Sequence, residues 1–172
     1  RLGNLDDMTG RALRTLREAD VIAAEDTRVT GRLLSLLGVS EAERPRLVAH
    51  HAHDVRAIPK LLEELAGGRR VALVADAGTP TISDPGAELV AAAAAAGARV
   101  VSLPGACAAV TALAASGLGG EGAVVLHGFV PRRRGSASRG AALREIANDA
   151  RTHVLYEAPH RLAHTLRELC DA

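Results

Sequence analysis

The chain has 172 residues, of which 48% are apolar, and it carries a formal net charge of +1 at pH 7. This apolar fraction supports a buried core and excludes a disordered or collagen-like chain. The two aromatic residues, Phe129 and Tyr156, are too few for a base-stacking platform, and the near-neutral charge argues against a basic clamp over the whole surface.

Six short β-like runs recur along the chain at intervals of 24 to 30 residues, about the length of one βα unit. They are residues 21–25, 46–50, 71–75, 99–103, 123–127 and 153–157. Helical patterns lie between them, with shared apolar faces at Ala12, Leu13, Leu16 and Ala19 and at Ile58, Leu61, Leu62 and Leu65. Strands that alternate with helices predict an α/β protein with a largely parallel sheet and helices on both faces.

A glycine-rich segment at residues 117–122 marks the expected domain boundary, because four of its six residues are glycine. It predicts an N-terminal α/β domain at residues 1–118 and the start of a second α/β domain at residues 119–172. The second portion holds only two of the β-like runs, and a two-stranded piece is marginal on its own. Either it docks on the first domain or the chain is incomplete.

Membrane and export signals are the next features that the sequence can test. The longest apolar stretch, residues 89–96, is far shorter than the roughly 20 residues that cross a bilayer. No N-terminal segment resembles a signal peptide, so we expect a cytoplasmic protein with no membrane partner. Cys107 and Cys170 are expected to be small buried residues without a disulfide, because two cysteines so far apart form no framework.

Polar and turn-forming residues gather directly after the β-like runs. Ligands of open parallel sheets bind beyond the carboxyl ends of the strands, so these segments are the expected site. The longest is the eleven-residue loop 76–86, with two glycines, two prolines, two aspartates and three hydroxyl residues. Ordinary βα connections take 2–6 residues, which favours a binding loop over a plain connection. The loop contains neither of the phosphate-binding patterns GxxxxGK[ST] and GxGxxG.

Three further segments each allow both a functional and a purely structural interpretation. Pro104 and Gly105 open a helix after a strand, which suits either a ligand edge or a tight turn. The histidines His50, His51 and His53 fit no standard zinc spacing, so we expect a polar loop and no metal. The run Arg132, Arg133 and Arg134 is either a phosphate contact or a solvated charge run.

Several motifs together resemble the ribosomal RNA small subunit methyltransferase I branch of the tetrapyrrole methylase superfamily. They are LGNLDD at residues 2–7, EDTR at 25–28, DAGTPTISDPG at 76–86, PGACA at 104–108, GFVP at 128–131 and YEAPHR at 156–161. They occur in the family's order over nearly the whole chain. Members of that branch transfer a methyl group from S-adenosylmethionine to the ribose 2′-oxygen of a cytidine in 16S ribosomal RNA.

The resemblance implies two α/β domains with a cofactor cleft between them, the second domain being incomplete in this chain. It implies that S-adenosylmethionine contacts Asp76, Ala77, Gly78, Thr79, Ile82, Cys107, Ala108, Tyr156 and Glu157. The ribose 2′-hydroxyl is a poor nucleophile until a base removes its proton or a contact polarises it. Our candidates for the base are Glu25 and Asp26. Arg28 is expected either to bind a phosphate or to lower the pKa of the hydroxyl. His50 and His53 are reserve candidates for the base. The other interpretation of residues 25–28 is a cluster of capping contacts and ion pairs at the strand end.

Contacts to RNA are expected from Arg132, Arg133, Arg134, His160 and Arg161, with packing at a helix start as the alternative for the last two. The expected partners are small-subunit ribosomal RNA, within the assembled 30S subunit, and a second copy of the chain in a homodimer.

The chain departs from the family pattern in three ways. The family's first strand and the proline of its opening turn are missing or altered here, and family members continue past the position of Ala172. Cys107 stands where the family usually has serine, and His127 where it often has glutamate. Two rival functions therefore stay open: a small-molecule tetrapyrrole methyltransferase, and a truncated cofactor-binding module without catalysis.

Overall fold

The computed structural model describes residues 3–51, 55–120, 122–131 and 137–172, and it divides into two compact units. The first is Arg1–Cys107 and the second is Ala108–Ala172. The division precedes the expected boundary by one helix, α5 (Ala108–Ser116). This helix packs against a strand of the second unit, and the Leu118 carbonyl that follows it accepts a hydrogen bond from Thr152 Oγ1 at 3.0 Å.

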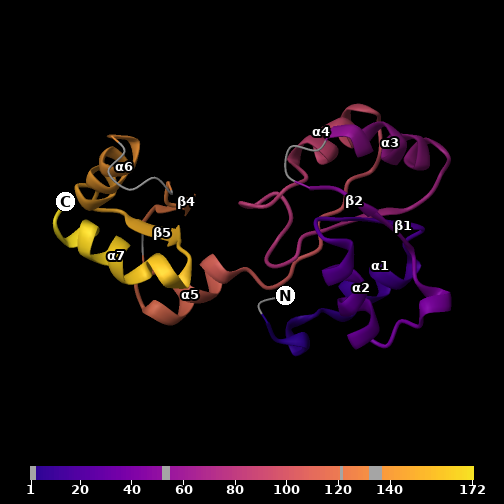
Figure 1. The fold of residues 1–172 in the computed structure, drawn as a ribbon, viewed down its shortest axis with the longest axis horizontal. Helices are drawn as coiled ribbons and strands as arrows, with labels where there is room; N and C mark the ends of the chain where they lie inside the picture. Colours follow the sequence, from indigo (N-terminus) through magenta and orange to yellow (C-terminus); the bar gives the residue numbers. More distant parts are fainter. Residues whose placement is uncertain (1–2, 52–54, 121, 132–136) are drawn as a thin grey trace. The chain divides into compact units, whose positions relative to one another are not determined.

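The first unit is built on three parallel strands in the order β2-β1-β3 (Figure 1). Their bounds are Val21–Ala24 for β1, Arg46–Ala49 for β2 and Val71–Val74 for β3. The α-helices are α1 (Gly10–Glu18), α2 (Thr27–Leu36), α3 (Ile58–Ala66) and α4 (Ala87–Ala95), and the 3₁₀ turns are η1 (Leu5–Asp7), η2 (Glu41–Glu43) and η3 (Val55–Ala57). The predicted helical faces around Leu16 and Leu61 are confirmed, and Pro59 lies in the first turn of α3.

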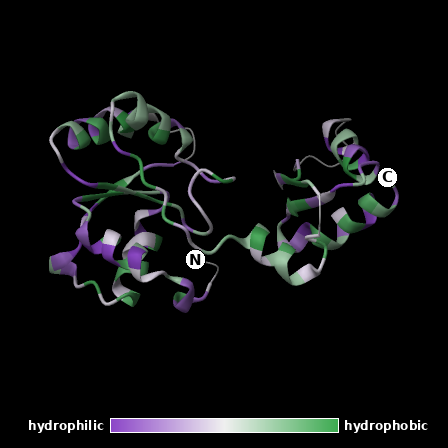
Figure 2. Ribbon diagram, turned by 180° about the vertical axis from the view of Figure 1, so that it is seen from behind, coloured by the Kyte–Doolittle hydropathy of each residue, from purple (hydrophilic) through white to green (hydrophobic). Residues whose placement is uncertain are grey.

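The central strand β1 is fully buried because helices cover both faces of its sheet. Ile22 and Ala24 pack on one face with Leu16 of α1 and Leu34 of α2. Val21 and Ala23 pack on the other with Leu61 of α3 and Leu89 of α4. Figure 1 shows these two helix pairs on opposite sides of the strands, and Figure 2 shows the apolar colouring of the strands between them. The predicted α/β sandwich is confirmed in this unit.

The second unit pairs two parallel strands, β4 (Val124–Phe129) and β5 (Thr152–Tyr156). The register shifts between Leu126 and Gly128, which marks a bulge in β4. Helices α6 (Ala137–Ala147) and α7 (Pro159–Cys170) pack against each other. None of the helices in the described ranges is long and apolar enough to cross a membrane.

One predicted strand is wrong. Residues 99–103 are irregular, with Val100 and Val101 exposed by 49% and 56%. A strand requires a neighbouring ladder, and this segment joins neither described sheet. The Ser102 carbonyl instead accepts a hydrogen bond from the Arg11 guanidinium at 3.0 Å. A β-branched run is therefore insufficient evidence for a strand without a partner.

Candidate functional site

The carboxyl ends of the three strands of the first unit lie level with one another. Ala24 is in register with Ala49 on one side and with Val74 on the other. The polar residues that follow these strands therefore meet at one edge of the sheet, where parallel α/β folds bind ligands. This geometry brings together the EDTR segment and the loop 76–86, which lie 50 residues apart in the sequence.

Glu25 and Asp76 join the two strand ends by hydrogen bonds that run in both directions. The backbone N–H of Asp76 donates to Glu25 Oε2 at 3.2 Å, and the backbone N–H of Asp26 donates to Asp76 Oδ1 at 3.2 Å. Each carboxylate thus fixes the start of the neighbouring loop. Within the described residues, the second oxygen of Glu25 makes no hydrogen bond that would compete with a ligand.

Asp26 caps helix α2 and is occupied by Arg28. Its Oδ1 accepts from the Arg28 backbone N–H at 2.8 Å and from Nε at 3.1 Å, and its Oδ2 pairs with Nη2 at 2.6 Å. These hydrogen bonds from Arg28 hold the pKa of the Asp26 carboxyl far below its usual range. Asp26 therefore accepts a proton weakly and orients Arg28, whose side chain is 89% exposed.

The loop 76–86 follows a backbone path that most residues avoid. Thr81 and Ser83 have positive φ of 73° and 61°, and Gly78 and Gly86 have φ of 73° and 117°. A Cβ on Gly86 would lie 2.5 Å from Leu73 Cδ2, so only glycine fits against β3 there. Non-glycine residues in the left-handed region are concentrated at binding sites, where surrounding structure holds them in place.

Asp84 is a site residue that the sequence analysis did not single out. Its Oδ2 lies 3.4 Å from the position that a Cβ on Gly78 would occupy. Burial, followed by the charges of Glu25 and Asp76, raises the pKa of the Asp84 carboxyl. The charges of Glu25, Asp76 and Asp84 therefore act on one another at this strand end, and Gly78 leaves room beside Asp84. The aspartate before Pro85 was the available signal, but only the folded loop brings it back to Glu25.

The other expected cofactor residues of the first unit are less enclosed. Ala77 and Ile82 are exposed, whereas Thr79 and Cys107 are half-buried, and Ala108 begins α5 in the second unit. The expectation that both cysteines are buried is wrong for Cys170, which is exposed in the last turn of α7 near the chain end. Neither cysteine forms a disulfide.

His50 is 3% exposed at the end of β2, and its backbone N–H donates to the Ala24 carbonyl at 2.8 Å. Its Nδ1 is buried without a hydrogen-bond partner among the described residues. His53, the other reserve residue, lies outside the described residues. Over the described ranges, no cluster of three or more His, Cys, Asp or Glu side chains is placed to hold a metal ion.

The second unit places its expected site residues at the end of β5 and the start of α7. Tyr156 lies against Phe129 with ring centroids 5.4 Å apart. The Glu157 side chain is 5% exposed and pairs with both Arg139 and Arg161. His160 is exposed, whereas the Arg161 side chain is 15% exposed. Arg132, Arg133 and Arg134 lie outside the described residues.

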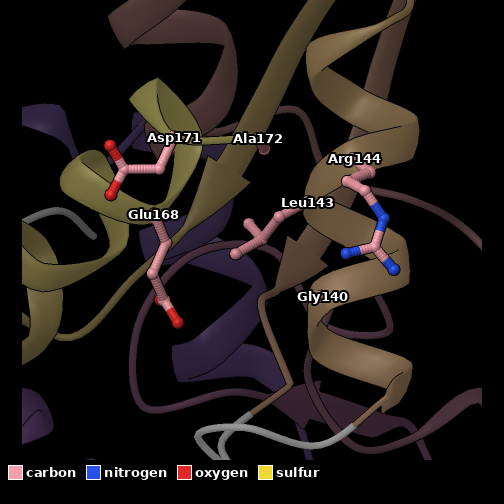
Figure 3. Close-up of a pocket in the computed structure, with 6 residues that line it drawn as sticks. All are labelled: Gly140, Leu143, Arg144, Glu168, Asp171 and Ala172. Atoms are coloured by element: carbon pink, nitrogen blue, oxygen red, sulfur yellow. The ribbon is translucent and has the colours of Figure 1, made fainter.

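A pocket of about 240 Å³ lies elsewhere in the second unit, between α6 and α7 (Figure 3). Its lining residues are Gly140, Leu143, Arg144, Glu168, Asp171 and Ala172. Figure 3 shows Leu143 and Glu168 extending into the space between the two helices. None of the expected cofactor or RNA residues lines it.

Curated relatives match almost the whole chain. A protein of Halalkalibacterium halodurans is 48% identical over 98% of the chain, one of Escherichia coli O157:H7 is 46% identical over 98%, and one of Pseudomonas aeruginosa is 44% identical over 99%. All three are named ribosomal RNA small subunit methyltransferase I. The chain covers 56%, 57% and 58% of these relatives' lengths, respectively, and thus spans little more than half of each.

Among solved structures, uroporphyrin-III-C-methyltransferase from Thermus thermophilus has the same fold, with a TM-score of 0.62. It is 24% identical, and the match covers 98% of this chain and 69% of that one. The family model of the tetrapyrrole (corrin/porphyrin) methylases matches residues 2–172. By sequence and by fold, the chain belongs to the tetrapyrrole methylase family.

Proposed function

We propose that the protein methylates the ribose 2′-oxygen of a cytidine in 16S ribosomal RNA, with S-adenosylmethionine as methyl donor. The observation that carries this proposal is the 44–48% identity to relatives named ribosomal RNA small subunit methyltransferase I. The likeness to the uroporphyrin enzyme is 24% and supports the fold alone. Identity therefore favours ribosomal RNA over a tetrapyrrole as the substrate.

The strand-end residues of the first unit suit S-adenosylmethionine, which supplies a methyl group on a positively charged sulfur. Glu25, Asp76 and Asp84 provide negative charge for a cation, and Gly78 leaves room beside them. We assign the donor to contacts with Asp76, Ala77, Gly78, Thr79 and Ile82, and to Cys107, Ala108, Tyr156 and Glu157. Since the sulfur's charge disappears during transfer, orientation of the reacting atoms matters more than strong attraction.

Of the two residues proposed from the sequence as the base, we favour Glu25. Asp26 is held by Arg28 at a low pKa, so it binds the proton of a 2′-hydroxyl poorly. Glu25 uses one carboxylate oxygen on the Asp76 N–H and retains the other for substrate. Arg28, bonded to Asp26 and exposed, is suited to an RNA phosphate. The proposed catalytic group is therefore Glu25 as base, with Asp26 and Arg28 orienting the RNA.

RNA contacts are assigned to Arg132, Arg133, Arg134, His160 and Arg161. A net charge of +1 requires the basic residues to act locally, because the surface as a whole offers little attraction for phosphate. The proposed substrate is the assembled 30S subunit in the cytoplasm, and the proposed assembly is a homodimer. Sedimentation equilibrium tests the dimer, and a single species of monomer mass would contradict it.

The decisive experiment offers three acceptors to the protein with radiolabelled S-adenosylmethionine: unmodified 30S subunits, naked 16S RNA and uroporphyrinogen III. We expect label only in RNA, with the 30S subunit as the better acceptor. Alkaline digestion then locates the methyl group, because a methylated 2′-oxygen cannot attack the adjacent phosphate. A label-bearing, alkali-resistant dinucleotide that begins with cytidine supports the proposal.

Other results point elsewhere. Label in uroporphyrinogen and none in RNA assigns the protein to tetrapyrrole methylation. Label in RNA that alkali releases as mononucleotide places the methyl group on a base. Binding of S-adenosylmethionine in calorimetry without transfer to any acceptor identifies a binding module without catalysis.

A further inference from the structure

The second unit buries an arginine that the proposed reaction does not use. Arg139 of α6 is 2% exposed, yet it carries a full charge among the helices and strands of this unit. Its Nε and Nη2 donate to Glu168 Oε2 of α7 at 3.0 and 2.6 Å. Buried charges persist only when they are paired and hydrogen-bonded, so Glu168 explains how Arg139 is tolerated.

Further contacts of Arg139 reach the ends of both strands. Nη1 donates to the carbonyl of Pro131, just beyond β4, at 2.7 Å. Nη2 donates to Thr165 Oγ1 at 2.7 Å, and the Thr165 hydroxyl donates in turn to Glu157 Oε2, just beyond β5, at 2.7 Å. One side chain therefore holds the exits of β4 and β5. A salt bridge that served only to join α6 to α7 would need no contact with either strand end.

Glu157 transmits this restraint to Arg161. Its Oε1 accepts from the Ala158 backbone N–H at 2.8 Å and pairs with Arg161 Nη2. Burial tends to raise the pKa of the Glu157 carboxyl, but the hydrogen bonds from Thr165 and Ala158 and the charges of Arg161 and Arg139 outweigh it, so the pKa is lowered. Glu157 is thus a fixed anion, and Arg161 is oriented by it.

Arg161 has a donor left over. Its Nη1 is buried and makes no hydrogen bond within the described residues, while Nη2 is held by Glu157. Because Glu157 holds Nη2, the guanidinium has a set orientation, and the 15% of the Arg161 side chain that is exposed is available to an anionic oxygen. Charged donors left unpaired are costly, which favours a ligand that completes the set.

We propose that Arg139 and Thr165 are positioning residues that fix Glu157 and thereby aim the Arg161 guanidinium at a phosphate oxygen of the RNA. The functional half of this inference rests on the proposed function, whereas the positioning half concerns the second unit alone. Arg139 anchors the network, and the Thr165 hydroxyl is the connection that can be removed without unpairing a buried charge.

The test compares Thr165→Val, which keeps the side chain's shape but removes its hydroxyl, with Thr165→Ser, which keeps the hydroxyl. Rotation of the Arg161 guanidinium about its Nε–Cζ bond, followed by NMR, reports positioning without any assay of activity. We expect it to accelerate roughly tenfold in Thr165→Val, as befits the loss of one hydrogen bond to a charged group, and to stay unchanged in Thr165→Ser. Circular dichroism establishes that both variants are folded.

Methylation of 30S subunits supplies the second readout. We expect the KM for the subunit to rise roughly tenfold in Thr165→Val, with kcat at saturating donor and subunit unchanged, and Thr165→Ser to restore the KM. Unchanged rotation in Thr165→Val overturns the positioning role, and faster rotation with an unchanged KM overturns its connection to RNA.

If Thr165→Val does not fold, Arg139→Lys replaces it, and unchanged Arg161 rotation there overturns the proposal. A wild-type protein that fails to methylate RNA refutes the proposed function, while the rotation measurement still decides the positioning.

Discussion

The two units treat charge at their strand ends in opposite ways. In the first, Glu25 and Asp76 are bonded to backbone N–H groups, and Asp84 adds a third carboxylate without a buried cation among them. In the second, the buried cation Arg139 is surrounded by Glu157 and Glu168. Backbone dipoles leave the first edge negative and open to a cation, whereas side-chain pairing neutralises the second and directs an arginine at an anion.

The proposals above assign ligands of opposite charge to these two strand ends. Carboxylates that cap loops retain their charge because N–H groups stabilise it without cancelling it. Ion pairs cancel charge and depend on every partner being present. We therefore expect substitutions at the strand ends of the first unit to lower the reaction rate with little effect on stability. Substitutions in the ion-pair network of the second unit should lower the free energy of unfolding.

The largest effect expected in the first unit is on rate. Glu25→Gln preserves an acceptor for the Asp76 N–H but cannot take a proton, so single-turnover methylation of 30S subunits should slow about 10²–10⁴-fold. Asp26→Asn is the matched comparison: it loosens Arg28, which Asp26 orients, so it should weaken binding of the subunit but keep the single-turnover rate at saturating subunit within about tenfold of wild type. A fast Glu25→Gln beside a slow Asp26→Asn would transfer the role of base to Asp26.

In the second unit the largest effect is on stability. Arg139→Met leaves Glu168 and Glu157 without their buried partner, and the free energy of unfolding should fall by about 3–5 kcal/mol. Urea denaturation followed by circular dichroism measures it. Arg151→Met removes an arginine paired with Asp149 at the surface, and it should leave the denaturation midpoint unchanged. Equal losses in both variants would mean that burial of Arg139 does not matter.

A backbone change tests whether the loop of the first unit needs its shape. Gly86→Ala places a Cβ against Leu73 at a φ of 117°, which should lower the free energy of unfolding by about 1–3 kcal/mol. Gly68→Ala is the control, since φ there is 78° and no atom lies within 4 Å of the added Cβ. If the two variants lose the same free energy of unfolding, the contact with Leu73 adds nothing to the cost of backbone strain.

The smallest effect concerns pH. Because the pKa of Asp84 is raised in the folded protein, the folded state binds its proton more tightly than the unfolded chain does. Asp84 therefore lowers stability as pH rises above the carboxyl's ordinary pKa of 3.8, and Asp84→Asn should stabilise the protein at pH 7 but not at pH 3. Thermal unfolding at both pH values measures this. A stabilisation that is equal at both would show that charge is not the cause.

Local pattern was enough to predict most of the fold. Five of the six β-like runs are strands. Each is an apolar run that ends in polar residues. The run at residues 99–103 has the same composition but no neighbouring strand in the described sheets. Strand pairing is a property of the partner as much as of the segment, so sequence alone could not distinguish this case.

The candidate site divides in the same way. Residue types and their positions after strands were sufficient to indicate the EDTR segment, the loop 76–86 and the start of α7. Which carboxylate is free to accept a proton depends on hydrogen bonds between segments 50 residues apart, and so does the place of Asp84. The sequence could not indicate the arginine network between α6 and α7, because no local pattern distinguishes a buried arginine from an exposed one. The family and the α/β alternation could be predicted from the sequence, as could the segments proposed to carry chemistry, since all three depend on local pattern. Which side chains are hydrogen-bonded or paired with one another became clear from the folded structure, because those contacts depend on distances between segments that the chain order leaves open.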